Sequence, residues 1–324
     1  MTQVSSHVVQ DYTVTRLRIL ARQYDRCLAA LRTRADALKS VREWRRKLQR
    51  VFGRFPERTP LNVSVNRRLE RRGYRIEMLT YESRPGFFVT ANLYMPRGHG
   101  PFPAALQPCG HAKNGKAYKC YQALCHGLAR QGYAVLIYDP VSQGERSHQY
   151  RRDDGLDALL DCCREHNMAG NQPALIGDFF GTWRLWDGIR SLDVLLSRPE
   201  VDRARVGVTG SSGGGTLSTY LNALDDRITM AAPSCFVTTF LCNLENELPA
   251  DAEQIPPGLL GAGLDMADFV IASAPRRTLL LGQATGPDRS ISPAGAWALC
   301  WPRLPRSCPG RQAGIAAQCP AVVT

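Results

Sequence analysis

Apolar residues recur every three or four positions between residues 17 and 51, with arginines in many of the positions between them. This spacing places the apolar side chains along one face of an α-helix and the charged side chains on the other. Pro56 and Pro60 then end the helix, because proline lacks the amide hydrogen that a helix needs. The pattern predicts one long amphipathic helix within an N-terminal extension of residues 1–60.

A second pattern begins after residue 72, where β-branched and aromatic residues become frequent. Residues 73–81 and 87–95 flank a Ser-Arg-Pro-Gly turn, which predicts a β-hairpin. A short apolar run at 104–107, a helical pattern at 117–131 and a second apolar run at 133–138 follow. Strand, helix, strand in this order is a crossover unit, so this part of the sheet is expected to be parallel and covered on both faces.

The same alternation continues further along the chain. Residues 182–196 and 216–224 have helical patterns, whereas residues 205–211, 228–232 and 278–282 read as apolar strands. The fold class expected for residues 61–283 is therefore α/β, with a mostly parallel central sheet and helices on both faces.

Beyond residue 283 the character of the chain changes. Residues 284–324 contain six prolines but no Lys, Glu or His, and no period is sustained. A stretch of this length without predicted structure is uncommon inside a compact domain. We expect an irregular, atypical tail, either replaced or out of frame, which leaves the C-terminal part of the α/β domain incomplete and one edge of its sheet exposed.

The formal net charge of +12 is concentrated in the N-terminal part, where residues 11–75 hold 19 Lys and Arg against 6 Asp and Glu. A basic helix can bind nucleic acid or an anionic membrane. The simpler interpretation is a solvated arginine face on a helix that packs against the body, since no aromatic residues or binding motif accompany the charge. We expect no nucleic-acid partner.

Eleven cysteines are present without a C-x-x-C pair, which indicates reduced thiols rather than a metal site or a disulfide framework. The N-terminus has no signal-peptide pattern, and no run of 18 apolar residues occurs. We expect a cytoplasmic, soluble protein with no metal or other cofactor. The sequence leaves the oligomeric state open.

Candidate chemistry appears where the strand at 205–211 meets the next helix. Gly210, Ser212 and Gly214 form a G-x-S-x-G motif. In a nucleophile elbow, small flanking residues let the chain turn sharply and expose the serine hydroxyl above the sheet. The bare motif occurs by chance in glycine-rich chains, but the strand before it and the helix after it match the setting that an elbow requires. Ser212 is the candidate nucleophile.

Several stretches around this motif carry a family resemblance. Residues 186–193, 197–202 and 207–216, together with the Pro-Cys-Gly-His loop at 108–111 and the loop at 138–147, resemble the acetyl xylan esterase-like α/β-hydrolases. These enzymes are related to dienelactone hydrolases and to the catalytic domain of prolyl oligopeptidase. The resemblance implies the α/β-hydrolase fold and stops near residue 283.

The family uses Ser, Asp and His in that chain order, with the histidine accepting the proton of the serine. Ser212 matches the nucleophile. The backbone N–H of Gly213, with one from the loop around Gly110 and His111, matches the oxyanion hole that stabilises the developing negative charge.

The acid and the base of the triad are not found where the family places them. The acid is expected just after the strand that ends at Gly282, and Asp288 is the one acidic residue available there. None of the six histidines follows Ser212. His111 is an alternative base if it reaches across the strand ends, and His148 is a more remote one.

The sequence therefore predicts a carboxylic ester hydrolase for small acyl esters, acetyl esters of carbohydrates among them, whose activity is impaired by the missing triad residues. Two alternatives stay open. One is a non-catalytic protein whose basic helix binds nucleic acid or a membrane. The other is a prolyl oligopeptidase-type peptidase, which ranks lower because no propeller-like repeats precede the α/β domain.

Overall fold

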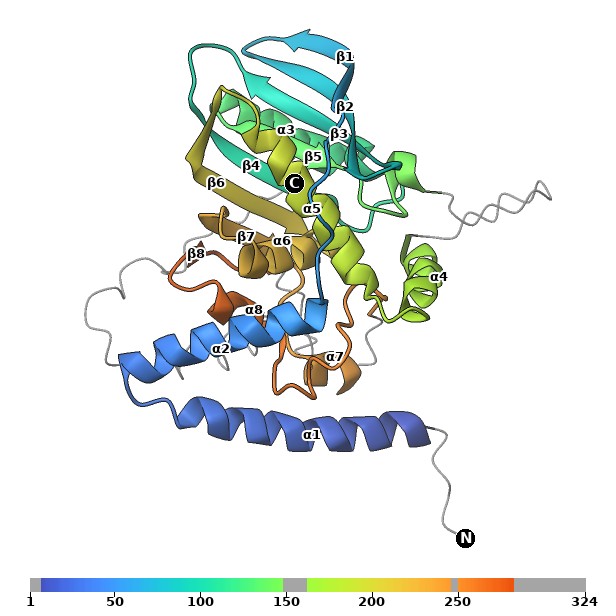
Figure 1. Cartoon of the computed structure of the whole chain (residues 1–324), viewed down its shortest axis with the longest axis vertical. Coiled ribbons are helices and arrows are strands. Elements are labelled where there is room, and N and C mark those ends of the chain that lie inside the picture. Colours follow the sequence, from blue (N-terminus) through green and yellow to red (C-terminus); the bar gives the residue numbers. More distant parts are fainter. Residues whose placement is uncertain (1–6, 148–161, 246–249, 283–324) are drawn as a thin grey trace, which may run out of the picture.

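The computed structural model describes residues 7–147, 162–245 and 250–282, and within them one eight-stranded sheet forms the centre of the molecule (Figure 1). The strand order is β1-β2-β3-β5-β4-β6-β7-β8. The strands are β1 (Ser64–Arg71), β2 (Tyr74–Arg84), β3 (Phe87–Pro96), β4 (Phe102–Pro108), β5 (Ala134–Tyr138), β6 (Val201–Ser211), β7 (Met230–Ser234) and β8 (Arg277–Thr278).

The sheet is mixed. Strands β1, β2 and β3 pair antiparallel, and β3 pairs antiparallel with β5. Strands β5, β4, β6, β7 and β8 pair parallel with their neighbours in that order. The predicted hairpin, the crossover unit and the α/β fold class are confirmed. Strand β1 was not expected, since its alternation of exposed polar residues carries little apolar signal.

Helices cover both faces of the sheet. They are α3 (Lys119–Arg130), α4 (Cys162–Ala174), α5 (Phe180–Leu196), α6 (Gly213–Leu224), α7 (Phe240–Glu245) and α8 (Met266–Ala272). Alternate residues of a strand point to opposite faces. Leu106 and Leu136 accordingly join the core with α5 and α6, whereas Val135 and Ile137 pack with Cys125 of α3. Residues 151–180, which the sequence pattern left unassigned, contribute α4.

The N-terminal helical pattern forms two helices, so the prediction of one long helix is wrong. These are α1 (Val8–Ala29) and α2 (Arg34–Phe52). The physical reason is a capping box. The Thr33 hydroxyl accepts a hydrogen bond from the Asp36 amide (3.1 Å), and the Asp36 carboxylate accepts one from the Thr33 amide (2.9 Å). These bonds start a new helix although the apolar period continues.

Replacing Thr33 with alanine removes the hydroxyl of this cap. We expect the free energy of unfolding to fall by about 1 kcal/mol, within the range of roughly 0.5–2 kcal/mol typical of N-caps. Urea denaturation measures this change. Thr33→Ser, which retains the hydroxyl, is the matched control, and equal losses in both variants would contradict the assignment of a cap.

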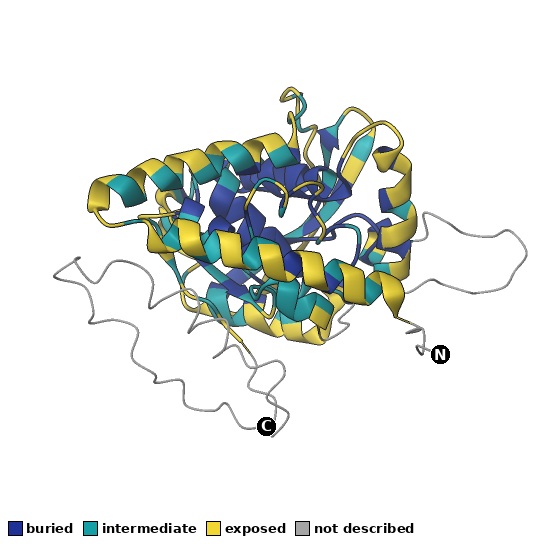
Figure 2. Cartoon of the chain, turned by 90° about the horizontal axis from the view of Figure 1, so that it is seen from below, coloured by how far each residue is buried: buried dark blue, intermediate teal, exposed yellow. Residues whose placement is uncertain are grey.

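Helix α2 packs into the main core. Leu48 and Phe52 are buried, and the Phe52 ring makes edge contacts with the rings of Phe179, Tyr220 and Phe269. The outward faces of the helices are exposed, as Figure 2 shows. The packing matches the expectation of a solvated basic face on a packed helix. Whether residues 1–60 are a separable unit stays a prediction.

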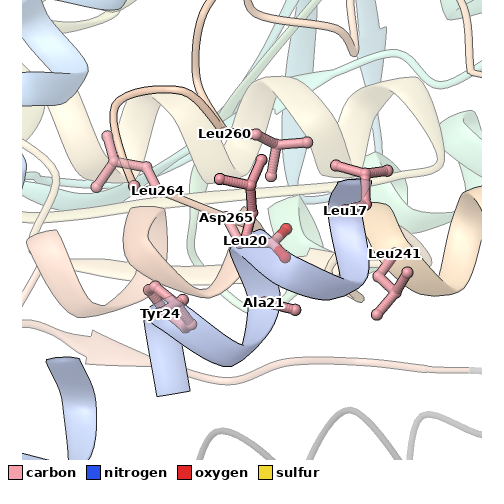
Figure 3. A pocket seen from close by; sticks show the side chains of 9 residues that line it. Leu17, Leu20, Ala21, Tyr24, Leu241, Leu260, Leu264 and Asp265 are labelled. Atoms are coloured by element: carbon pink, nitrogen blue, oxygen red, sulfur yellow. The ribbon is translucent and has the colours of Figure 1, made fainter. Parts of the chain in front are cut away.

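Helix α1 lies beside the segment around α7 and α8. Figure 3 shows the apolar pocket between them, lined by Leu17, Leu20, Tyr24, Leu241, Leu260 and their neighbours. The Tyr24 hydroxyl donates a hydrogen bond to Asp268 (2.9 Å), and Arg18 forms an ion pair with Glu245 (2.8 Å). None of the helices in the described ranges is long and apolar enough to cross a membrane.

At the far edge of the sheet, β8 contributes two residues, followed by a bridge between Ser234 and Leu281. Met230, Leu279 and Leu281 are substantially exposed there. This agrees with the expected incompleteness of the C-terminal part. The predicted tail itself lies outside the described residues.

Candidate functional site

Ser212 lies at the sharp turn between β6 and α6. Its backbone has φ 58° and ψ −121°, a conformation that a serine adopts only when the surrounding structure enforces it. The Ser212 amide donates to the Ser234 carbonyl (3.0 Å), and its carbonyl accepts from the Thr216 amide (2.9 Å). A Cβ at Gly214 would lie 2.4 Å from the Pro108 carbonyl oxygen, so a side chain has no room there. Ser212 thus has the geometry of the predicted elbow.

His111 lies on the loop that follows β4 and faces this serine. Its Nδ1 is 2.6 Å from the Ser212 Oγ. The same nitrogen accepts the backbone N–H of Gly213 at 3.2 Å. The two elements meet because β4 and β6 are parallel neighbours, which brings their carboxyl ends to the same edge of the sheet.

Gly213 lets the imidazole approach the serine closely. A Cβ on Gly213 would lie 2.7 Å from His111 Nε2 and 2.7 Å from Glu253 Oε1. Such distances are too short for any side chain without moving the histidine. The glycine after the serine therefore makes room for His111 as well as for the turn.

Two carboxylates contact the other side of the imidazole. His111 Nε2 is 2.9 Å from Glu253 Oε1 and 3.1 Å from Asp251 Oδ2. Both acids are buried, with side-chain exposures of 0% for Glu253 and 3% for Asp251. They lie on the segment between α7 and α8. The arrangement is a serine, a histidine and a carboxylate in hydrogen-bond contact, which is the geometry of nucleophilic catalysis.

A second buried layer supports the carboxylates. His166 of α4 lies 2.7 Å from Asp251 Oδ2 through its Nδ1, while its Nε2 contacts the Arg184 guanidinium. Arg184 of α5 is fully buried and forms an ion pair with Glu253 (2.7 Å). It also donates to the Gln143 side chain (2.8 Å). Each buried charge therefore has an opposite charge or a hydrogen-bond partner.

The pKa values follow from these contacts. Burial acts to lower the pKa of His111, but its hydrogen bonding to Asp251 and Glu253 and their negative charges outweigh it and raise the pKa to about 10. Burial and the Arg184 charge lower the pKa of His166. Burial opposes ionisation of Asp251, yet hydrogen bonds from both histidines hold its pKa below the usual range. Neutral His166 therefore lies beside a protonated His111 near pH 7.

The predicted site residues divide into those that lie together and those outside the described ranges. Ser212, Gly213, Gly110 and His111 lie together. Gly110 packs against the Ser211 carbonyl, where a Cβ would lie 2.0 Å from the oxygen, and its own carbonyl accepts from the Gln143 side chain. Asp288 and His148 lie outside the described residues.

Four further residues belong to the site and were missed by sequence reasoning: Asp251, Glu253, His166 and Arg184. None belongs to a short motif, and the segment around residue 250 shows no helical or strand period. No local sequence pattern indicates that these four ionisable side chains are buried together, so the structure was needed to find them.

The cluster also raises the question of a metal ion. Ligand atoms of His111, His166, Asp251 and Glu253 all lie within 4.8 Å of one another, a composition that zinc accepts. However, the Arg184 guanidinium donates to His166 Nε2, which places the proton of neutral His166 on Nδ1. The Nδ1 that faces the cluster is then a donor and not a ligand. The residues present suit a proton network better than a divalent cation.

Comparison with known proteins gives one family match. The family model described as acetyl xylan esterase matches residues 58–253, more than half of the chain. The matched range begins after α2 and ends at Glu253, so it includes the serine, the histidine and both carboxylates.

Individual relatives agree with this match. The candidate hydrolase YtaP of Bacillus subtilis is 27% identical over 208 residues, which cover 60% of this chain and 63% of the relative. The chain thus spans less than two thirds of that curated relative. A candidate acetyl xylan esterase from Bacteroides fragilis, of known structure, superposes with a TM-score of 0.64 at 19% identity, covering 85% of this chain and 78% of its own. The methylesterase BT1017 superposes with a TM-score of 0.58 at 24% identity, and the match covers 80% of this chain and 55% of that protein.

Proposed function

This chain belongs to the acetyl xylan esterase family, and from that premise we propose that it hydrolyses carboxylic esters of small acyl groups. Ser212 is the nucleophile and His111 is the general base. The observation that carries the proposal is the 2.6 Å contact between Ser212 Oγ and His111 Nδ1 at an elbow built for an exposed hydroxyl. Acetyl esters of carbohydrates are the proposed substrate class, because the family and the Bacteroides fragilis structure are named for acetyl xylan.

The reaction runs through an acyl-enzyme. Ser212 Oγ attacks the ester carbonyl carbon while its proton passes to His111 Nδ1. The tetrahedral intermediate collapses, the alcohol leaves with the proton from Nδ1, and the acyl group stays on Ser212. Water then attacks the acyl-enzyme with His111 again as base, which releases the carboxylic acid and restores the serine.

The two carboxylates hold the imidazole and stabilise its charged form. Glu253 accepts the Nε2 hydrogen at 2.9 Å, which leaves Nδ1 free to face the serine. This differs from the family expectation of an acid and a histidine after the nucleophile. Here we propose the chain order His111, Ser212, Glu253, with Glu253 in the role that was assigned to Asp288.

Gly213 links the proton transfer to the oxyanion hole. In molecules where His111 is neutral, the Gly213 N–H donates to the free lone pair of His111 Nδ1. Once Nδ1 has taken the serine proton it no longer has a lone pair, so that hydrogen bond is lost and the N–H becomes available to the developing oxyanion. One oxyanion donor is worth about 3 kcal/mol in other hydrolases.

The proposal accounts for the expected impairment. A base with a pKa of about 10 is unprotonated in about one molecule in 10³ at pH 7, so few molecules can start the reaction. We therefore still expect weak activity at pH 7, but for a different reason. The base is not missing; it is His111, which is held in its protonated form.

Turnover of p-nitrophenyl acetate tests this directly. We expect the rate to rise about tenfold per pH unit between pH 7 and pH 9 and to level off near pH 10, because only neutral His111 accepts the serine proton. Glu253→Gln removes one carboxylate charge, so the profile should move to lower pH. Ser212→Ala measured at each pH supplies the blank for alkaline hydrolysis. A rate above this blank that is flat or falls over that range would overturn His111 as the base.

A further inference from the structure

His166 is a buried histidine that the reaction above does not use. It lies on α4 with a side-chain exposure of 0%, and its two ring nitrogens have different partners. Nε2 faces the Arg184 guanidinium, which can only donate. Nε2 must therefore be the acceptor, and the proton of neutral His166 is on Nδ1.

That proton points at Asp251. His166 Nδ1 is 2.7 Å from Asp251 Oδ2, and His111 Nε2 is 3.1 Å from the same oxygen. One carboxylate oxygen thus accepts a hydrogen bond from His166 and lies within ion-pair distance of His111 Nε2. The contact with His166 is the shorter one, so this residue withdraws part of the negative charge that would otherwise act on His111.

We propose that His166 is a positioning residue that fixes Asp251 against His111 and limits how strongly this carboxylate holds the proton of His111. The inference rests on the proposed function, because His166 would set the fraction of molecules in which His111 can accept the Ser212 proton. Arg184 completes the arrangement by holding His166 in one tautomer.

Groups from three other elements face the His111 ring. Ser212 and Gly213 lie at Nδ1, and Asp251 and Glu253 lie at Nε2. From α4, the His166 ring lies 5.6 Å from the His111 ring. A hydrogen bond with Cys162 and burial raise the pKa of the Cys163 thiol, although the His111 charge acts to lower it, so Cys163 is neutral. The Arg184 guanidinium contacts His166 and Glu253, and every variant used to test this inference retains it.

Replacing His166 with leucine removes the donor to Asp251. Asp251 Oδ2 then acts on His111 alone, so the proton of His111 is held more tightly. The expected result is a shift of the p-nitrophenyl acetate pH profile to higher pH by about half a unit or more, which lowers the rate at pH 8 about threefold or more. His166→Asn is the second variant, because its Nδ2 can replace the Nδ1 donor, and it should bring the profile back towards that of the unchanged chain.

An Asp251→Asn background separates positioning from general damage. Without the carboxylate, His166→Leu should cause no further shift of the profile. A loss of rate that is equal at every pH, or a shift that persists in the Asp251→Asn background, would overturn the proposal. Circular dichroism of each variant confirms that it is folded before the rates are compared.

Imidazole ¹⁵N NMR gives a readout that does not depend on turnover. The signal lost in His166→Asn identifies His166, and exposed His99→Asn is the control. We expect His166 to be neutral with its proton on Nδ1 at pH 7, and a charged ring or an Nε2–H tautomer would overturn the inference. A failure of the proposed function appears separately, as unchanged turnover in Ser212→Ala.

Discussion

Replacing Ser212 with alanine is expected to abolish ester hydrolysis above the background. The Oγ at 2.6 Å from His111 Nδ1 is the atom that forms the acyl-enzyme, and no covalent step is possible without it. Loss of a nucleophile in a serine hydrolase costs about 10³-fold or more in kcat. Turnover of p-nitrophenyl acetate at pH 9, where more His111 is neutral, measures this effect.

Neighbouring variants decide whether the effect is specific. Ser211→Ala changes the adjacent hydroxyl and should retain most of the activity. His111→Ala should lose about as much as Ser212→Ala, and the double variant should lose no more than either one, because the two residues act as a unit. If Ser212→Ala kept a tenth of the rate or more, Ser212 would not be the nucleophile.

A large effect on stability is expected from replacing Arg184 with methionine. The guanidinium and the Glu253 carboxylate both have a side-chain exposure of 0%. Methionine fills much of the volume but leaves Glu253 Oε2 without the guanidinium that pairs with it. Breaking a buried pair from one side costs about 3–5 kcal/mol. The free energy of unfolding from urea denaturation should fall by that amount.

Two comparisons test the cause. Adding Glu253→Gln to Arg184→Met removes the charge that has lost its guanidinium partner, so part of the lost stability should return. Arg205→Met changes an exposed arginine paired with Asp202 and should cost less than about 1 kcal/mol. An equal decrease in the free energy of unfolding for Arg184→Met and Arg205→Met would show that the buried pair stabilises the protein no more than the exposed pair.

Much of the fold is predictable because each element has its own local pattern. The crossover unit from β4 to β5 and the helix that ends at Leu196 follow from apolar spacing alone. The break between α1 and α2 was not predicted, since the apolar period runs through Leu31 and Ala35 while the capping box depends on two polar side chains. Strand β1 is exposed on most positions and leaves no apolar alternation to detect.

The candidate site is predictable only where a motif defines it. Ser212 follows from G-x-S-x-G and its neighbours, and the proximity of Gly110 and His111 follows from parallel strands ending at one edge. Asp251 and Glu253 reach His111 through the segment between α7 and α8, which has no pattern that specifies its path. That His111 Nδ1 contacts the serine hydroxyl, with two acids on its opposite side, required the structure.

Because Asp251 and Glu253 raise the pKa of His111, activity and stability are expected to change in opposite directions as the pH rises. An unfolded histidine has a pKa of about 6.5, so stabilisation by protonated His111 is complete below that pH and is lost as pH rises through about 10. Alkaline buffer thus increases the number of competent molecules while it shortens their lifetime. Product yield over a long incubation should peak at a milder pH than the initial rate does.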